Sequence, residues 1–135
     1  CGGGSNHRFG LYDAVMIKDN HIKASGGISS AVEKIRKALG NKSKIEVETQ
    51  NLDEVREALA QKVDIIMLDN MSIDSIYESV KVIDGKAIVE VSGGVNFERL
   101  EEISKTGADF VSIGALTHSA PAVDISMNII SPLVK

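Results

Sequence analysis

The sequence contains a single cysteine, at position 1 of 135 residues. One cysteine excludes an internal disulfide and a zinc site built from cysteines. No apolar run approaches the roughly 20 residues that cross a bilayer, and no charged-then-apolar segment indicates secretion. A basic excess is also missing, because 15 Lys and Arg stand against 19 Asp and Glu, for a net charge of −4. These features predict a cytoplasmic domain with small ligands, without a nucleic-acid or membrane partner.

Strand-like and helix-like patterns alternate along most of the chain. From residue 44 on, apolar β-rich runs begin about 20 to 23 residues apart, the length of one strand, one helix and two short loops. We predict strands at 14–18, 44–49, 64–68, 87–91 and 110–113. Apolar residues at helical spacing predict helices at 28–39, 52–59, 73–83 and 97–103. Three of these helices follow predicted N-caps, which are Asn51, Ser72 and Asn96.

This alternation predicts an α/β fold with parallel strands joined by right-handed crossovers. An open doubly wound sheet is the alternative, but its G-x-G-x-x-G fingerprint is absent. Polar residues at the ends of several strands favour a (β/α) barrel instead. A complete barrel takes at least about 200 residues. We therefore expect residues 1–135 to form the C-terminal portion of a barrel domain that lacks its first strand and an N-terminal part.

Two segments near the start offer positive charge. A glycine-rich turn at 2–5 precedes His7 and Arg8. The backbone N–H groups of this turn could form an anion-binding nest, with the guanidinium of Arg8 as a bidentate fork for a carboxylate. The alternative is a flexible segment with an incidental His-Arg pair. Lys18 ends a predicted strand and could be a Schiff-base nucleophile, an electrostatic anchor or a solvated lysine. His21 could be a ligand or a loop histidine whose ring bonds the backbone, and we favour the loop role.

Three carboxylates lie on the next two predicted strands. Glu46 and Glu48 alternate and so face the same side, while Asp69 ends the following strand, which predicts Glu48 and Asp69 at equivalent heights. This pair could hold Mg²⁺ or stabilise positive charge on a sugar ring. The alternative is a pair of structural carboxylates with satisfied partners.

Two glycine-bearing strand ends follow later in the chain. Ser92, Gly93 and Gly94 end one strand, and Gly114 ends the next, just before His118. Successive turns of this kind match the usual phosphate site of barrel enzymes, because glycine lets a phosphate approach backbone N–H groups closely. The alternative is turn glycines alone, with His118 capping a short segment.

Six ordered motifs carry a family resemblance over essentially the whole chain. They are CGGG-x-NHR-x-GL at 1–11, IKDNHI at 17–22, EVE with NL at 46–52, LDNM at 68–71, SGG at 92–94 and SIGALTH at 112–118. The sequence closely resembles quinolinate phosphoribosyltransferase, the carboxylating nicotinate-nucleotide pyrophosphorylase of NAD biosynthesis. A paralogous branch associated with molybdenum transport operons shares much of this pattern.

The resemblance implies a reaction and a set of site residues. In the family, an unusual α/β barrel and a separate N-terminal α/β sandwich domain work as a dimer or higher homo-oligomer. With Mg²⁺, quinolinate and phosphoribosyl pyrophosphate give nicotinate mononucleotide, pyrophosphate and CO₂. By motif, His7, Arg8 and Lys18 match the quinolinate-binding cations. The acids near the ribose and Mg²⁺ match Glu48 and Asp69, and the phosphoribosyl contacts match Ser92, Gly93, Gly114 and His118.

The sequence departs from the family at the front. An Arg-Lys pair on the first barrel strand and an arginine from the N-terminal domain of a neighbouring subunit are not found in these 135 residues. We therefore expect the isolated chain to be inactive or nearly so. Two other functions stay open: a barrel aldolase or isomerase that uses Lys18 as a Schiff base, and a non-catalytic fragment or binding subunit that needs a separate chain.

Overall fold

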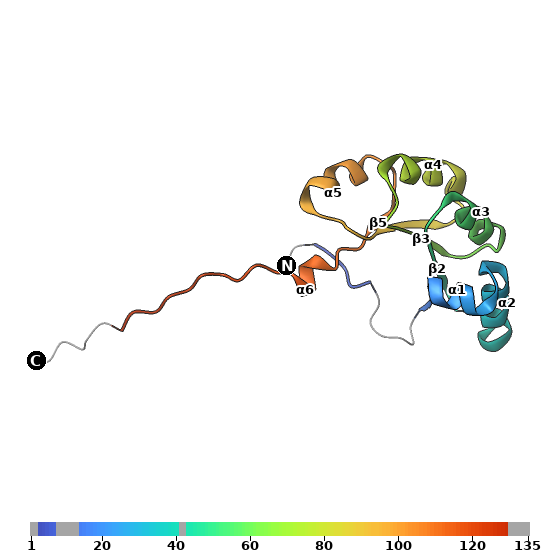
Figure 1. Cartoon of the computed structure of the whole chain (residues 1–135), viewed down its shortest axis with the longest axis horizontal. Coiled ribbons are helices and arrows are strands. Elements are labelled where there is room, and N and C mark those ends of the chain that lie inside the picture. Colours follow the sequence, from blue (N-terminus) through green and yellow to red (C-terminus); the bar gives the residue numbers. More distant parts are fainter. Residues whose placement is uncertain (1–2, 8–13, 41–42, 130–135) are drawn as a thin grey trace, which may run out of the picture.

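The computed structural model describes residues 3–7, 14–40 and 43–129, and these contain one five-stranded parallel sheet (Figure 1). Neighbouring strands in the sheet are also consecutive in the chain, in the order β1-β2-β3-β4-β5. This order, without a reversal, is that of a barrel wall and confirms the predicted partial α/β barrel. The strands are β1 (Val15–Ile17), β2 (Ile45–Thr49), β3 (Ile65–Asp69), β4 (Ile88–Ser92) and β5 (Phe110–Val111).

Six helices are found in the described residues, and the longer ones form an arc outside the strands (Figure 1). They are α1 (Asp19–Ser25), α2 (Ile28–Leu39), α3 (Leu52–Ala60), α4 (Ile73–Ile83), α5 (Phe97–Ser104) and α6 (Ala115–His118). The three predicted N-caps are confirmed. Asn51, Ser72 and Asn96 each accept a hydrogen bond from the backbone N–H three residues later.

The two faces of the sheet differ sharply in polarity because side chains alternate along each strand. The face that packs against the helices is aliphatic and fully buried, as at Ile17, Val47, Ile66 and Leu68. On the opposite face, the register aligns Met16, Glu46, Ile65 and Ile88 in one row across the strands. The next row along the strands aligns Glu48, Met67, Glu90 and Phe110. The inner face therefore carries the carboxylates, and burial of the aliphatic face holds them in place.

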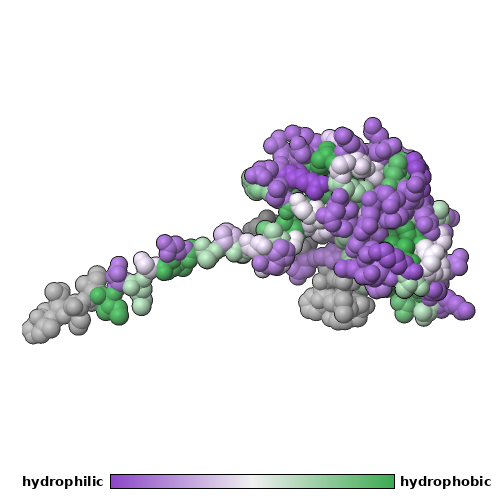
Figure 2. All heavy atoms as spheres, in the orientation of Figure 1, coloured by the Kyte–Doolittle hydropathy of each residue, from purple (hydrophilic) through white to green (hydrophobic). Residues whose placement is uncertain are grey.

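Three segments differ from expectation. Residues 19–25, where His21 was expected in a loop and no helix was predicted, form α1, which is supported by the ion pair between Lys23 and Asp19 at 3.0 Å. The strand expected at 110–113 is shorter in the structure, where only Phe110–Val111 pairs with β4. Beyond α6, residues 119–129 form neither helix nor strand and extend away from the body (Figures 1 and 2). Among all described helices, none combines the length and the apolar character that a bilayer crossing requires.

Candidate active site

Glu48 and Asp69 lie on the same face of the sheet, on neighbouring strands. The ladder pairs Glu48 on β2 with Met67 on β3. Asp69 is the next residue after Met67 on β3 whose side chain faces the same side, and the ladder pairs it with Ser92 on β4. The two carboxylates are thus diagonal and not directly opposed, because register is set by the hydrogen-bond ladder and not by distance from each strand's end. Both side chains are half-buried.

The electrostatics of Glu48 reflect this arrangement. Burial raises the pKa of the Glu48 carboxyl above its ordinary value, and the neighbouring charge of Asp69 raises that pKa further. The positive charge of Lys18 acts on the same group in the opposite direction. A lysine and two carboxylates from three consecutive βα units therefore share one electrostatic environment.

Lys18 directly follows β1 and is the N-cap of α1, with its side chain exposed. Its backbone N–H donates to Nδ1 of His21 at 3.0 Å. The predicted backbone bond of His21 is confirmed, although His21 lies in a helix and not in a loop. Arg8 lies outside the described residues.

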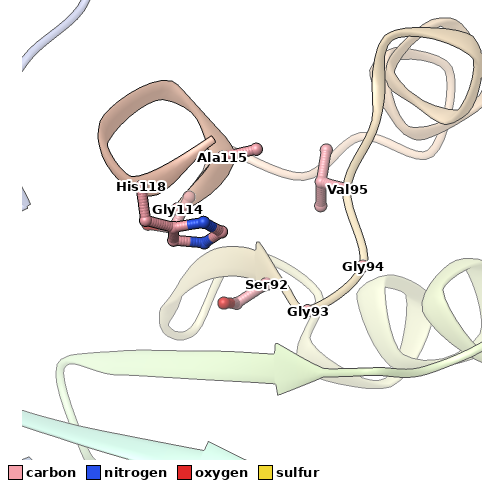
Figure 3. Close-up of a pocket in the computed structure, with 8 residues that line it drawn as sticks. Ser92, Gly93, Gly94, Val95, Gly114, Ala115 and His118 are labelled. Atoms are coloured by element: carbon pink, nitrogen blue, oxygen red, sulfur yellow. The ribbon is translucent and has the colours of Figure 1, made fainter. Parts of the chain in front are cut away.

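The glycine-bearing strand ends meet in one cavity of about 290 Å³. Figure 3 shows His118 of α6 projecting toward the end of β4, where Ser92 lies. All five residues predicted for a phosphate site line this cavity. Of the other three, Ser112 and Ala115 belong to the motif at 112–118 but were not predicted as site residues, and Val95 was not singled out. The full lining is Ser92, Gly93, Gly94, Val95, Ser112, Gly114, Ala115 and His118.

Glycine is required at position 93, and a side chain at position 114 would displace the ring of His118. Gly93 has a φ of +83°, and a Cβ there would lie 2.4 Å from Cγ and Oδ1 of Asn70 and 2.7 Å from its backbone nitrogen. A Cβ on Gly114 would lie 3.0 Å from Nε2 of His118. Close backbone approach, more than freedom of the turn, is therefore the reason for these glycines.

Asn70 and Arg99 connect the two halves of the site. Asn70 adopts a left-handed φ of 54°, donates from its side chain to Asp69 at 2.8 Å, and donates its backbone N–H to the carbonyl of Ser92 at 3.0 Å. Arg99 donates to the carbonyl of Gly93 at 3.2 Å and also to the carbonyl of Met71. Sequence reasoning missed Arg99, whose only signal is its place three residues after the N-cap Asn96. Together these contacts join the loop after β3 to the loop after β4.

His7 lies over the same polar face. Its Nε2 is 3.1 Å from Oε2 of Glu46 and 3.5 Å from Oε1 of Glu90. Glu90 in turn accepts a hydrogen bond from the hydroxyl of Ser112. The ligand atoms of His7, Glu46 and Glu90 all lie within 4.8 Å of one another. Sequence reasoning missed Glu90, whose signal is the same alternation in β4 that marks Glu46 in β2.

Comparison with known proteins decides the family. A sequence model described as the quinolinate phosphoribosyl transferase C-terminal domain matches residues 1–128. The chain belongs to this family. The family predicted from the six motifs is therefore confirmed.

Curated relatives of the chain are similar to it over almost its whole length. A probable nicotinate-nucleotide pyrophosphorylase [carboxylating] of Bacillus subtilis is 46% identical over 129 residues, which cover 96% of this chain and 45% of the relative. The protein of the same name from Synechocystis is 48% identical, with 96% and 45% covered. The chain thus spans about half the length of these curated relatives.

Solved structures show the same barrel. NadC from Streptococcus pyogenes superposes with a TM-score of 0.86 at 43% identity, covering 94% of this chain and 45% of that one. The nicotinate-nucleotide pyrophosphorylase from Francisella tularensis gives 0.82 at 50% identity, with 87% and 41% covered. A thiamine phosphate pyrophosphorylase from Pyrococcus furiosus gives 0.62 at 19% identity, covering 75% of this chain and 48% of that one, and shares the fold alone.

Proposed function

We propose that this chain provides the phosphoribosyl-transfer site of an enzyme that joins quinolinate to phosphoribosyl pyrophosphate. The products are nicotinate mononucleotide, pyrophosphate and CO₂, a step of NAD biosynthesis. The observation that carries the proposal is that the turns at Ser92–Gly94 and at Gly114 line one cavity, and that the ladder pairs Ser92 of this cavity with Asp69. Membership of the quinolinate phosphoribosyl transferase family supports it.

The cavity would hold the 5-phosphate of the donor. Glycine at positions 93 and 114 would let the phosphate approach the backbone N–H groups of both turns closely. His118 and the hydroxyls of Ser92 and Ser112 line the same space and add side-chain donors. This arrangement fixes the sugar with its reacting carbon directed along the polar face.

The acceptor would lie over the beginning of the sheet. Quinolinate is a dianion, and Lys18 and His7, with Arg8 beside it in the sequence, are the cations that the family motif assigns to it. Holding both carboxylates aims the ring nitrogen at the sugar carbon, which turns an encounter of two molecules into a reaction within one complex. Lys18 acts here as an electrostatic anchor.

Glu48 and Asp69 would serve the sugar and the metal. As pyrophosphate leaves, positive charge develops on the ribose ring, and two carboxylates on the adjoining face stabilise it. The same pair offers hard oxygen donors; burial, and after it the charge of Asp69, raise the pKa of Glu48, and a bound cation would offset both effects. Mg²⁺ held there supplies charge neutralisation for the leaving pyrophosphate. Loss of CO₂ then needs little from the protein, because the pyridinium ring accepts the electrons.

We also propose that the enzyme works as a homodimer or higher homo-oligomer. The apolar side chains of Val123, Ile125, Met127 and Ile129 are 79–86% exposed in the extended segment after α6 (Figure 2), and such a row favours burial against a partner. A cytoplasmic location stays a prediction. Sedimentation of the chain over a range of concentrations tests the assembly, and a monomer throughout would contradict it.

Calorimetric titration tests the function. Quinolinate titrated into the chain, followed by phosphoribosyl pyrophosphate with Mg²⁺, should give two saturable binding events. Nicotinate, which has one carboxylate fewer, should bind more weakly than quinolinate. A steady-state assay of CO₂ release should show little or no turnover by this chain alone. Absence of binding by both quinolinate and the donor would contradict the proposal.

A further inference from the structure

Two buried glutamates outside the proposed catalytic pair hold the imidazole of His7. Nε2 of His7 lies between Oε2 of Glu46 on β2, at 3.1 Å, and Oε1 of Glu90 on β4, at 3.5 Å. Only 3% of Glu46 and 5% of Glu90 is exposed. Carboxylates buried to this degree are costly unless hydrogen bonds or opposite charge compensate them. Their retention on the inner face of the barrel wall therefore calls for a role.

Ser112 extends this group of side chains to the phosphate cavity. Its hydroxyl donates to Oε1 of Glu90, the same oxygen that faces His7. Ser112 also lines the cavity with Ser92 and His118. A continuous path of contacts thus runs from the cavity through Ser112 and Glu90 to His7.

His7 uses one ring nitrogen for both carboxylates. Carboxylate oxygens accept hydrogen bonds from a ring N–H, and Nε2 is the ring nitrogen that faces both glutamates. Nδ1 lies on the other side of the ring, and within the described part of the chain it has no hydrogen-bond partner. The His7 side chain is 33% exposed. The two glutamates therefore fix the plane of the ring, with Nε2 toward both carboxylates and Nδ1 on the side away from them.

We propose that Glu46, Glu90 and Ser112 are positioning residues that orient His7 toward the anionic acceptor. The identity of the acceptor rests on the proposed function, whereas the orientation of His7 does not. Positioning groups of this kind act by locking the rotamer of the residue that touches the ligand. The acceptor site and the phosphate cavity then share one network, with Ser112 at the junction.

The orientation is tested by imidazole ¹⁵N–¹H correlation spectra of the full chain. Only three histidines contribute signals, and His7→Gln assigns those of His7. In the unmodified chain we expect a single set of His7 signals, as one fixed orientation of the ring requires. Glu46→Gln and Glu90→Gln should shift the His7 signals strongly, and Ser112→Ala more weakly. The control is Glu101→Gln, an exposed glutamate on α5 paired with Lys105, which should leave them unchanged.

Quinolinate calorimetry on the same proteins gives the second readout. We expect about tenfold weaker binding by Glu46→Gln and Glu90→Gln, in the range typical for residues that orient a binding group, and no change for Glu101→Gln. Unchanged His7 signals in both glutamine variants would overturn the proposal, and so would shifted signals with unchanged quinolinate affinity. Should a glutamine variant fail to fold, Ser112→Ala still tests the path with both glutamates in place.

Two further outcomes distinguish the positioning role from the proposed function and from a metal site. If the unmodified chain does not bind quinolinate while its His7 signals respond as expected, the proposed function fails and the orientation of His7 stands. If Mn²⁺ or Zn²⁺ at micromolar concentration broadens the His7 signals and Glu46→Gln abolishes the effect, the cluster is a metal site. That result would overturn the positioning role.

Discussion

Replacement of Gly93 by alanine should damage the fold and the candidate site together. Gly93 has a φ of +83°, and the added Cβ would lie 2.4 Å from two side-chain atoms of Asn70 and 2.7 Å from its backbone nitrogen. The left-handed conformation costs an alanine roughly 1–2 kcal/mol. Overpacking against a backbone atom, which no rotamer change relieves, costs about 1–3 kcal/mol more. We expect Gly93→Ala to lower the free energy of unfolding by roughly 2–5 kcal/mol.

Gly94→Ala is the matched control because it changes the same turn without the clash. Gly94 also has a positive φ, +57°, but the nearest atoms to its Cβ would lie 3.7 and 3.9 Å away. It should therefore lose only the conformational part, roughly 1–2 kcal/mol. Urea unfolding followed by circular dichroism measures both variants, since the sequence has no tryptophan for fluorescence. Equal losses in Gly93→Ala and Gly94→Ala would refute the close-approach argument.

Three other changes test separate parts of the structure. Burial and Asp69 raise the pKa of Glu48 in the folded state, so the folded state binds the carboxyl proton of Glu48 more tightly than the unfolded state does. The free energy of unfolding therefore falls as the pH rises from the ordinary pKa of glutamate through the raised one. Glu48→Gln should thus be more stable than the unmodified chain at pH 7 in metal-free urea titrations, and the difference should vanish below the ordinary pKa of glutamate. Lys18→Met should weaken quinolinate binding at least about tenfold by calorimetry, whereas the control Lys37→Met on α2 should leave the affinity unchanged. Borohydride should trap no adduct at Lys18, and a trapped adduct would favour Schiff-base chemistry. Asn96→Ala removes the N-cap of α5 and should cost about 1 kcal/mol in urea unfolding; no loss would mean that the cap bond to the Arg99 N–H is replaced by water.

Local patterns were sufficient to predict the elements that bury an aliphatic face. The strands around Val47 and Leu68 and the helices that begin after Asn51 and Ser72 all carry a clear period or a capping residue. Segment 19–25 forms α1 although its sequence lacks an apolar period, and it was missed for that reason.

The candidate site was predictable in its residues more than in its contacts. The glycine turns and His118 have sequence signals, and they do meet in one cavity. The diagonal placement of Glu48 and Asp69 depends on strand register, which a single sequence does not reveal. Glu90 and Arg99 contact His7 and Met71, which lie far away in the chain, so the weak local signals of these two residues do not reveal their roles.

The consecutive order of the strands has a consequence for how specificity could be changed. Under the proposed function, the bound molecules lie across the sheet in the direction in which the chain runs: the pyridine ring near Lys18, the ribose near Asp69, and the phosphate near Gly114. An engineer who wants a different aromatic acid as acceptor would therefore vary the first βα unit and keep the last two. Keeping the last two units would retain the site of the phosphoribosyl donor and also Glu90 and Ser112, which orient His7 for the acceptor.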